Sequence, residues 1–290
     1  MAHKFCFEAL DQSLRDIITN KSNSNQIFGG KVIVFGGDFR QILPVIPRGT
    51  CSNIVNAAIN SSYLWDLCEI LTLTKNMRLH SNLESIDEQE TATFAKWILD
   101  IADGIIGDEN DGYDTIQVPA HLLITRYDDP ISAIVKSTFP DLDQHHNNPE
   151  FFKSKAILAS TNETVEQINH YVLSFIPAEI ISGKNIGLAV YIPRMSMSPS
   201  QSPWLFKLLR RQFPIMLSYA MTINKSQGQS LSMVGLYFPK PVFTHGQLYV
   251  ALSRVNSAKG LKILIHDDEQ KSMNSTTNVV FKEVFRNIKR

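Results

Sequence analysis

The chain has 290 residues, of which 43% are apolar, and its 28 Lys and Arg balance 28 Asp and Glu. This apolar fraction can bury a core, which excludes a disordered chain, and the length allows one large domain or two ordinary ones. No stretch approaches the roughly 20 apolar residues of a membrane span, and the first residues lack a signal-peptide pattern. A nuclear or cytosolic location is therefore expected. The three cysteines form no C-x-x-C pair, so they are expected to be reduced thiols, with no disulfide framework and no metal site.

The charges are unevenly distributed along the chain. Between Glu84 and Glu150 fifteen residues are acidic and three are basic, whereas the segment from Lys184 to Lys262 holds ten Lys or Arg and no Asp or Glu. A cationic segment without acids can concentrate its field on a polyanion. The charge pattern therefore favours nucleic-acid contact over a basic surface without a partner.

The first half of the chain predicts two helices and two strands. Apolar residues at helical spacing predict an amphipathic helix at the start and another over 93–103, which ends at Gly104. The first helix carries Phe7, Leu10, Leu14 and Ile17. The run Lys31 to Phe35, closed by two glycines, is typical of a buried parallel strand, and 69–74 resembles the next strand.

The second half alternates strands with helices. Residues 108–150 are rich in Asp, Asn and Pro, which indicates a linker or loose surface region. Strands are expected at 156–160, 216–220, 233–238 and 261–265. Asn162 is expected to cap a helix through Tyr171, and Thr244 with Gln247 forms a capping-box pattern for a helix over 244–254. The tail from 270 to 290 is expected to be a loose helix. Together the elements predict an α/β fold with a mainly parallel sheet.

Two polar turns in the first half follow expected strands. Gly36 and Gly37 permit a sharp turn, after which Asp38 and Gln41 project from the strand end, where a Gln can bond a terminal phosphate or orient water. A plain strand-to-loop turn explains the same residues. Arg78 follows the second strand and could stabilise charge on a phosphoryl group, although a solvated surface Arg is the commoner case.

Two segments in the second half are more specific. The sequence AMTINKSQGQSL places polar and cationic side chains directly after a strand, which suits a phosphate track of a nucleic acid. These side chains are Thr222, Asn224, Lys225 and Gln227, followed by Gly228. In HGQLYVALSRV, Gln247 and Arg254 are two helical turns apart and share a face, so Arg254 could reach across a cleft.

These segments occur in the order GGDFRQ, T-x-N-M-R, TN-x-x-V-x-x-IN, TINKSQGQ and HGQLYVALSR. In that order they resemble helicase motifs of the petite-integration-frequency helicases and of the Helitron transposon helicase, in the RecD-like branch of superfamily 1. The resemblance runs from Met1 to about Ile265. It implies two RecA-like, P-loop NTPase-type units with mainly parallel sheets, the first incomplete.

The resemblance also implies roles for individual residues. The catalytic residues that would contact the γ-phosphate of ATP are Gln41, Arg78 and Arg254. The nucleotide-binding residues would be Gly37, Asp38, Gln41, Gly228, Gln247 and Arg254. Single-stranded DNA would contact Thr222, Asn224, Lys225, Gln227, Arg210 and Arg211. Gln41, Arg78 and Arg254 should then converge on one cleft.

Three departures from the family pattern stand out. The phosphate-binding loop G-x-x-x-x-G-K-[ST] does not occur in the sequence, and the Asp-Glu pair that binds Mg²⁺ in the family is absent as well. A long family segment between the portions matching HYVLSFIP and AEIISGKN is missing. The first sheet should consequently expose an apolar face.

The expected organisation is the remainder of a first RecA-like unit at 1–85, an acidic linker region at 86–150, a second unit at 151–270 and a polar tail at 271–290. The function implied by the resemblance is an ATP-dependent 5′-to-3′ DNA helicase that uses ATP and Mg²⁺, acts in repair, recombination and telomere maintenance, and resides in the nucleus. Two alternatives are a catalytically inactive nucleic-acid-binding remnant, which could be cytosolic, and an incomplete gene model.

Overall fold

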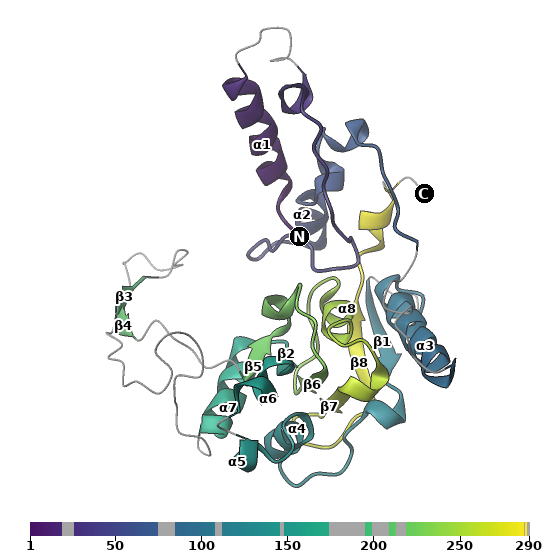
Figure 1. Ribbon diagram of the computed structural model, residues 1–290, viewed down its shortest axis with the longest axis vertical. Coiled ribbons are helices and arrows are strands. Elements are labelled where there is room, and N and C mark those ends of the chain that lie inside the picture. Colours follow the sequence, from purple (N-terminus) through teal and green to yellow (C-terminus); the bar gives the residue numbers. More distant parts are fainter. Residues whose placement is uncertain are drawn as a thin grey trace.

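A computed structural model describes residues 1–18, 26–74, 85–107, 112–145, 148–173, 195–198, 209–212, 219–286 and 288. Arg78 lies outside these residues. No helix within the described ranges is both long enough and apolar enough to cross a membrane. The described part is an elongated α/β structure with a parallel sheet at one end and an N-terminal helical extension at the other (Figure 1).

The centre of the fold is a four-stranded parallel sheet with the strand order β5-β2-β6-β7. Its strands are β5 (Ala220–Thr222), β2 (Lys155–Ala159), β6 (Met233–Phe238) and β7 (Leu261–Ile265). The expected strands at 156–160, 233–238 and 261–265 are therefore confirmed. The strand expected at 216–220 begins only at Ala220, and residues 213–218 lie outside the described part.

Helices cover both faces of this sheet because the apolar side chains of its strands alternate between the two faces. On β2, Ala156 and Leu158 belong to one apolar core, and Ile157 and Ala159 to the other. The second core is closed by α4 (Pro130–Thr138) and α7 (Asn162–Leu173). The first core is closed by α3 (Ser85–Ala102) and α8 (Gln247–Leu252).

The acidic segment and the tail are folded, contrary to expectation. The segment 108–150 contains β1 (Tyr113–Gln117), α4, and α5 (Leu142–His145), and it leads into α6 (Pro149–Lys153). The tail forms β8 (Ser275–Val279), which pairs antiparallel with β1. Ile116 and Val279 both lie in the first apolar core, so this strand pair is packed against it. Composition alone missed this pairing because its two strands are far apart in sequence.

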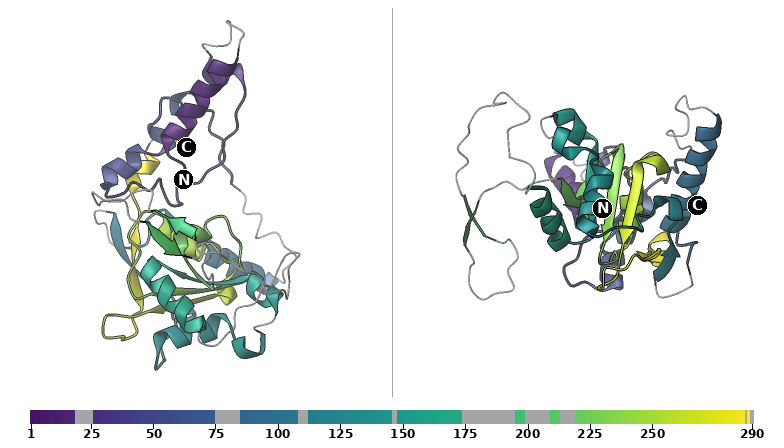
Figure 2. Two further views of the ribbon diagram at one scale, coloured as in Figure 1. Left: turned by 90° about the vertical axis from the view of Figure 1, so that its left-hand side faces the viewer. Right: turned by 90° about the horizontal axis from the view of Figure 1, so that it is seen from below.

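The N-terminal extension contains α1 (Lys4–Ile17) and α2 (Cys51–Asn56), and α1 projects away from the sheet (Figure 2). The expected first helix is confirmed, and so is the second, α3, which ends before Gly104 at a φ of 64°. Within α1, however, Asp11 is buried, while Leu10 and Ile17 are exposed. Asp11 accepts hydrogen bonds from Tyr63 and Arg15, which fixes the helix against the following segment.

The two strands expected in this extension are not formed. Residues 31–35 and 69–74 are extended but carry no strand pairing. A strand needs a neighbour to satisfy its backbone groups, and the described part of 1–74 offers neither segment such a neighbour. Val32 and Val34 are 93% and 88% exposed, and Leu71 and Leu73 are 82% and 97% exposed. The predicted apolar exposure is therefore present, although no first sheet is formed in the described residues.

The predicted cap of α7 needs correction. Helix α7 begins at Asn162, and Thr161 accepts the hydrogen bond from the backbone N–H of Thr164, so Thr161 is the cap. A short polar side chain just before the first helical residue is the usual place for this bond, so the cap lies one position before Asn162.

The remaining strands lie apart from the main sheet. They are β3 (Met195–Met197) and β4 (Arg210–Gln212), which pair as an antiparallel ribbon. Figures 1 and 2 show this ribbon separated from the four-stranded sheet, so Arg210 and Arg211 lie away from the other candidate site residues.

Candidate functional site

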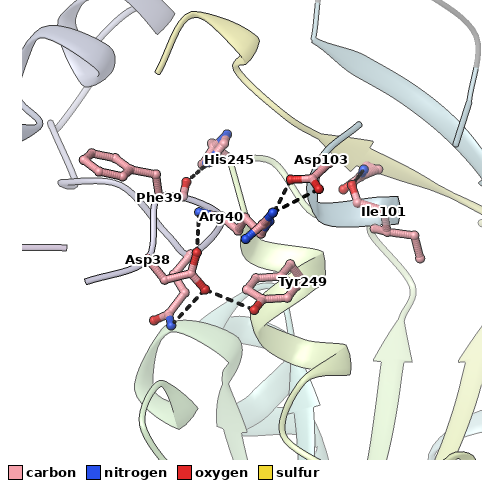
Figure 3. Close-up of polar contacts among 9 residues, drawn as sticks. Asp38, Phe39, Arg40, Ile101, Asp103, His245 and Tyr249 are labelled. Atoms are coloured by element: carbon pink, nitrogen blue, oxygen red, sulfur yellow. Dashed lines mark hydrogen bonds and ion pairs between the residues drawn. The ribbon is translucent and has the colours of Figure 1, made fainter. Parts of the chain in front are cut away.

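The turn over residues 38–41 is the centre of the candidate site. The carboxylate of Asp38 accepts hydrogen bonds from the backbone N–H of Arg40 at 3.0 Å and from the Tyr249 hydroxyl at 3.0 Å (Figure 3). The side-chain amide of Gln41 lies 3.5 Å from the same carboxylate. Both oxygens of Asp38 are thus engaged, which fixes the turn through one charged group.

Gln41 connects this turn to the segment after β5. Its side-chain oxygen accepts a hydrogen bond of 2.7 Å from the Gln227 amide, although the two residues are 186 positions apart. Gln227 follows a 3-10 helix over Ile223–Ser226, which begins directly at the carboxyl end of β5. Ligands of open α/β sheets bind at this edge of the sheet. The structure therefore brings Gln41 to the segment that the sequence connects with nucleic acid.

Arg254 lies on the other side of the same segment. Its guanidinium donates to the backbone oxygens of Gln229 at 2.8 Å and Ser226 at 3.2 Å, and its Nε donates to Val250 at 2.7 Å. The side chain is buried, so these bonds satisfy a charge that would otherwise be costly. The expectation that Arg254 is free to reach across a cleft is wrong for this conformation. Arg254 instead anchors the loop 226–229 that Gln227 belongs to.

The expected capping box at the start of α8 is also wrong. The helix begins at Gln247, after Gly246 with a φ of 71°, and ends at Leu252, so Arg254 lies beyond it. The buried Gln247 side chain accepts from the backbone N–H of Phe243 at 3.1 Å and donates to Asn224 at 3.1 Å. Gln247 and Arg254 therefore share no helix face, but both hold the segment after β5.

The turn 38–41 packs directly onto the start of α8. A Cβ atom at Gly246 would collide with the backbone oxygen of Arg40, so the close approach and the positive φ both require glycine. Next to it, His245 is fully buried. Its Nε2 lies 2.7 Å from the Phe39 oxygen, and its Nδ1 accepts the backbone N–H of Phe281 at 2.8 Å.

These two contacts define the chemical state of His245. A carbonyl oxygen can only accept, so Nε2 carries the proton, and Nδ1 is an unprotonated acceptor. Burial lowers the pKa of His245, and the contact with the Phe39 oxygen opposes that effect. The neutral ring consequently joins the turn, the start of α8 and the end of β8.

Arg40 adds a fourth connection to the turn. Its guanidinium makes two bonds to the carboxylate of Asp103, at 2.7 and 3.1 Å, just beyond the end of α3 (Figure 3). The hydrogen bonds to Asp103 raise the pKa of Arg40. Burial and the nearby Asp38 raise the pKa of Tyr249 to about 12, which keeps its hydroxyl protonated as a donor. Sequence reasoning missed His245, Tyr249 and the Arg40–Asp103 pair, because no local spacing connects them.

The remaining expected residues have different environments. Lys225, Asn224 and Gly228 are exposed beside the anchored loop, whereas Thr222 is buried at the end of β5. Gly37 is exposed, and a Cβ there would meet open space. Arg210 and Arg211 are exposed on the β3–β4 ribbon and are not brought to Gln41. Gln41 and Arg254 thus flank one loop, and the position of Arg78 is not described.

The described residues do not fit a complete nucleotide site. No group of three or more His, Cys, Asp or Glu among them could hold a metal ion. The sequence lacks the phosphate-binding loop pattern, and the Arg254 guanidinium is bonded to backbone oxygens. The described residues therefore offer no ligand set for Mg²⁺.

The fold and the site define a class. A parallel sheet, covered by helices on both faces and carrying its polar turns at the carboxyl edge, is typical of RecA-like α/β proteins. Two solved structures share this fold. The Pif1 helicase from Candida albicans matches with a TM-score of 0.55 and 18% identity over 98% of this chain and 73% of that chain. The Pif1 helicase from Bacteroides in complex with ADP-AlF3 and ssDNA matches with a TM-score of 0.52 and 16% identity, over 91% and 68% of the two chains.

Sequence comparison shows a similarity to one helicase family. Residues 1–112 match the model of the PIF1-like helicases. The ATP-dependent DNA helicase PIF1 of Danio rerio is 24% identical over 318 aligned residues, which cover 96% of this chain and 46% of the relative. The chain is therefore similar to the PIF1-like helicases, in agreement with the resemblance found in the motifs. It spans about half the length of this curated relative.

Proposed function

We propose that this chain is part of an ATP-dependent DNA helicase that moves 5′-to-3′ along single-stranded DNA. The observation that carries the proposal is the hydrogen bond between Gln41 and Gln227. It joins a turn of the GGDFRQ type, suited to a phosphate, to a loop that presents the exposed Lys225. A helicase needs such a connection, because nucleotide-driven closure must change how the protein holds its DNA.

In this proposal, two sets of residues act on different ligands. Gln41, Arg78 and Arg254 sense the γ-phosphate of ATP, with Gly37, Asp38, Gly228 and Gln247 lining the nucleotide side. The DNA contacts are Thr222, Asn224, Lys225, Gln227, Arg210 and Arg211. Arg254 would have to release the backbone oxygens of Ser226 and Gln229 before it could reach a phosphate. Nucleotide binding would therefore loosen the loop 226–229.

The organisation and the biological setting belong to the same proposal. The first RecA-like unit comprises residues 1–85 and the second comprises residues 151–270. The segment 86–150 links the two units, and it pairs with the tail 271–290 through β1 and β8. The solved relative that carries ssDNA supports single-stranded DNA as the ligand. We further propose a nuclear location and a role in repair, recombination and telomere maintenance, with ATP and Mg²⁺ as the cofactors of a complete enzyme.

One experiment separates this function from a nucleic-acid-binding protein without catalysis. The purified chain is assayed for ATP hydrolysis with and without oligo(dT), and oligo(dT) binding is measured by fluorescence anisotropy. We expect binding without DNA-stimulated hydrolysis, because the phosphate-binding loop and metal carboxylates that position ATP do not occur in the sequence. Fusion of a family segment that carries the loop should restore hydrolysis.

The other outcomes have distinct meanings. If the chain binds oligo(dT) and the fusion stays inactive, the protein is a binding remnant. If the chain alone hydrolyses ATP, and the Arg254→Ala variant does not, its phosphate site is built differently from the proposal. Absence of oligo(dT) binding would contradict the proposed DNA contacts.

A further inference from the structure

The hydroxyl group of Tyr249 is placed to control the turn 38–41 from helix α8. It donates a 3.0 Å hydrogen bond to the Asp38 carboxylate, and the two residues are 211 positions apart. Tyr249 is half-buried against the first apolar core, so its ring is held by packing while its hydroxyl faces the turn. Figure 3 shows the ring on α8 with its oxygen pointing at Asp38.

Asp38 in turn determines how the Gln41 side chain is oriented. A carboxylate only accepts, so the Gln41 amide must present its Nε2 group to Asp38 at 3.5 Å. Its oxygen then faces away from Asp38 and accepts the 2.7 Å bond from Gln227. The reverse orientation would place two oxygens together at Asp38 and two amide nitrogens together at Gln227. The order of donors and acceptors from Tyr249 to Gln227 is therefore fixed.

We infer that Tyr249 is a positioning residue. It holds the segment 224–229, which includes the loop 226–229, in register with the turn 38–41 through Asp38, Gln41 and Gln227. The inference rests on the proposed function for its role in DNA binding, because Lys225 belongs to this segment. Arg254 anchors the backbone of the same segment from the other side. Tyr249 thus positions the side-chain contact between the two segments, and Arg254 holds the backbone of the loop 226–229.

The test compares Tyr249→Phe, which removes only the hydroxyl, with wild type in two measurements. Hydrogen–deuterium exchange with mass spectrometry follows the segments 38–41 and 224–229, and fluorescence anisotropy follows binding of fluorescein-labelled oligo(dT). We expect faster exchange in both segments and an affinity about three- to tenfold weaker, which is the usual effect of removing one hydrogen bond. Gln41→Ala should weaken binding similarly, and the double variant should be no weaker than either single one, because one chain of bonds is broken once.

Tyr63→Phe provides a matched control. The Tyr63 hydroxyl also bonds a carboxylate, that of Asp11 at 2.7 Å, but this pair lies at α1. The control should leave exchange over 224–229 and oligo(dT) affinity at wild-type values. Asp38→Asn serves as a second variant if Tyr249→Phe lowers the thermal midpoint so far that the chain unfolds, and it should accelerate exchange over 224–229 as well.

Each outcome decides the inference. The inference is wrong if wild type, Tyr249→Phe and Asp38→Asn show equal exchange over 224–229. It is also wrong if the effects of Tyr249→Phe and Gln41→Ala on binding are additive. If wild type does not bind oligo(dT), the proposed function fails. The exchange measurement then still decides whether Tyr249 holds the loop.

Discussion

Arg40 and Asp103 are joined by two parallel hydrogen bonds across 63 positions of sequence, from the turn 38–41 to the end of α3. Their side chains are 39% and 28% exposed, so solvent screens the pair and weakens its contribution to stability. The two-bond geometry nevertheless fixes the orientation of the turn relative to α3, because the planar guanidinium matches the carboxylate.

A double-mutant cycle with Arg40→Ala and Asp103→Ala should give a coupling energy of about 0.5–1 kcal/mol in urea unfolding. Arg40→Lys should retain less than half of it, since an ammonium group cannot make both bonds. The control cycle is Lys96 with Asp100, an i,i+4 pair whose Lys is 78% exposed, and it should give less than about 0.5 kcal/mol. Equal coupling in both cycles would contradict a special role for the Arg40 pair.

Binding of oligo(dT) should depend on salt through Lys225 and Arg210. The plot of log affinity against log salt has a negative slope, and removing one phosphate-binding cation makes it less steep by about 0.7 for single strands. Lys225→Ala with Arg210→Ala should therefore flatten the slope by about 1.4 and weaken binding at low salt. Anisotropy titrations at several salt concentrations measure both effects.

The control for this prediction removes the same charge elsewhere. Lys153 and Lys271 are exposed and pair with Glu150 and Glu269, away from the loop 224–229. Lys153→Ala with Lys271→Ala should leave the slope near its wild-type value. If both double variants change it equally, binding follows net charge and not the proposed contacts.

Stability should fall as pH drops below about 6.5, because burial lowers the pKa of His245 in the folded state. The unfolded chain then binds a proton that the folded chain excludes, so unfolding is favoured between the ordinary pKa and the lowered one. Protonated Nδ1 would also face the N–H of Phe281 as a second donor. The charged neighbours Asp38 and Glu283 oppose this effect without reversing it.

Thermal midpoints of wild type and His245→Gln, measured between about pH 7.5 and about pH 5.5, check this prediction. The loss in wild type should approach about 1.4 kcal/mol per pH unit at most, and the variant should lose less. His121→Gln alters an exposed histidine and should keep the wild-type slope. Parallel curves for wild type and His245→Gln would show that another group titrates.

The isolated chain should self-associate through the extended segments 31–35 and 69–74. Val32, Val34, Leu71 and Leu73 are almost fully exposed there, and contiguous apolar exposure promotes association. Val34→Lys with Leu73→Lys should shift the light-scattering mass towards the monomer, whereas Met273→Lys, at a lone exposed residue, should not. A wild-type monomer at all concentrations would refute the prediction.

The local elements could mostly be predicted where short-range pattern decides them. The apolar runs at 233–238 and 261–265 became β6 and β7 with the predicted bounds, because buried parallel strands need continuous apolar residues. The helix before Gly104 ended as expected, since glycine tolerates the positive φ there. The ordered motifs likewise gave the resemblance to the PIF1-like helicases, and the comparisons find the same similarity.

The candidate site could be predicted only as a set of polar residues near strand ends. Gln41 and Gln227 were recognised separately, but their bond spans 186 positions and has no local signature. Arg254 was expected to be free, and packing instead buried it among backbone oxygens that it satisfies.

The sequence by itself determined the α/β class, the main parallel strands and the resemblance to helicases, because periodicity, turn residues and ordered motifs act over short distances. Only the tertiary structure decided that the acidic segment and the tail pair as β1 and β8, and that 31–35 stays without a strand partner in the described part of the chain. It also decided that Tyr249 and His245 hold the turn 38–41. Strand pairing and buried hydrogen bonds depend on which groups meet after the chain folds, and a buried donor must find whatever acceptor the packing supplies.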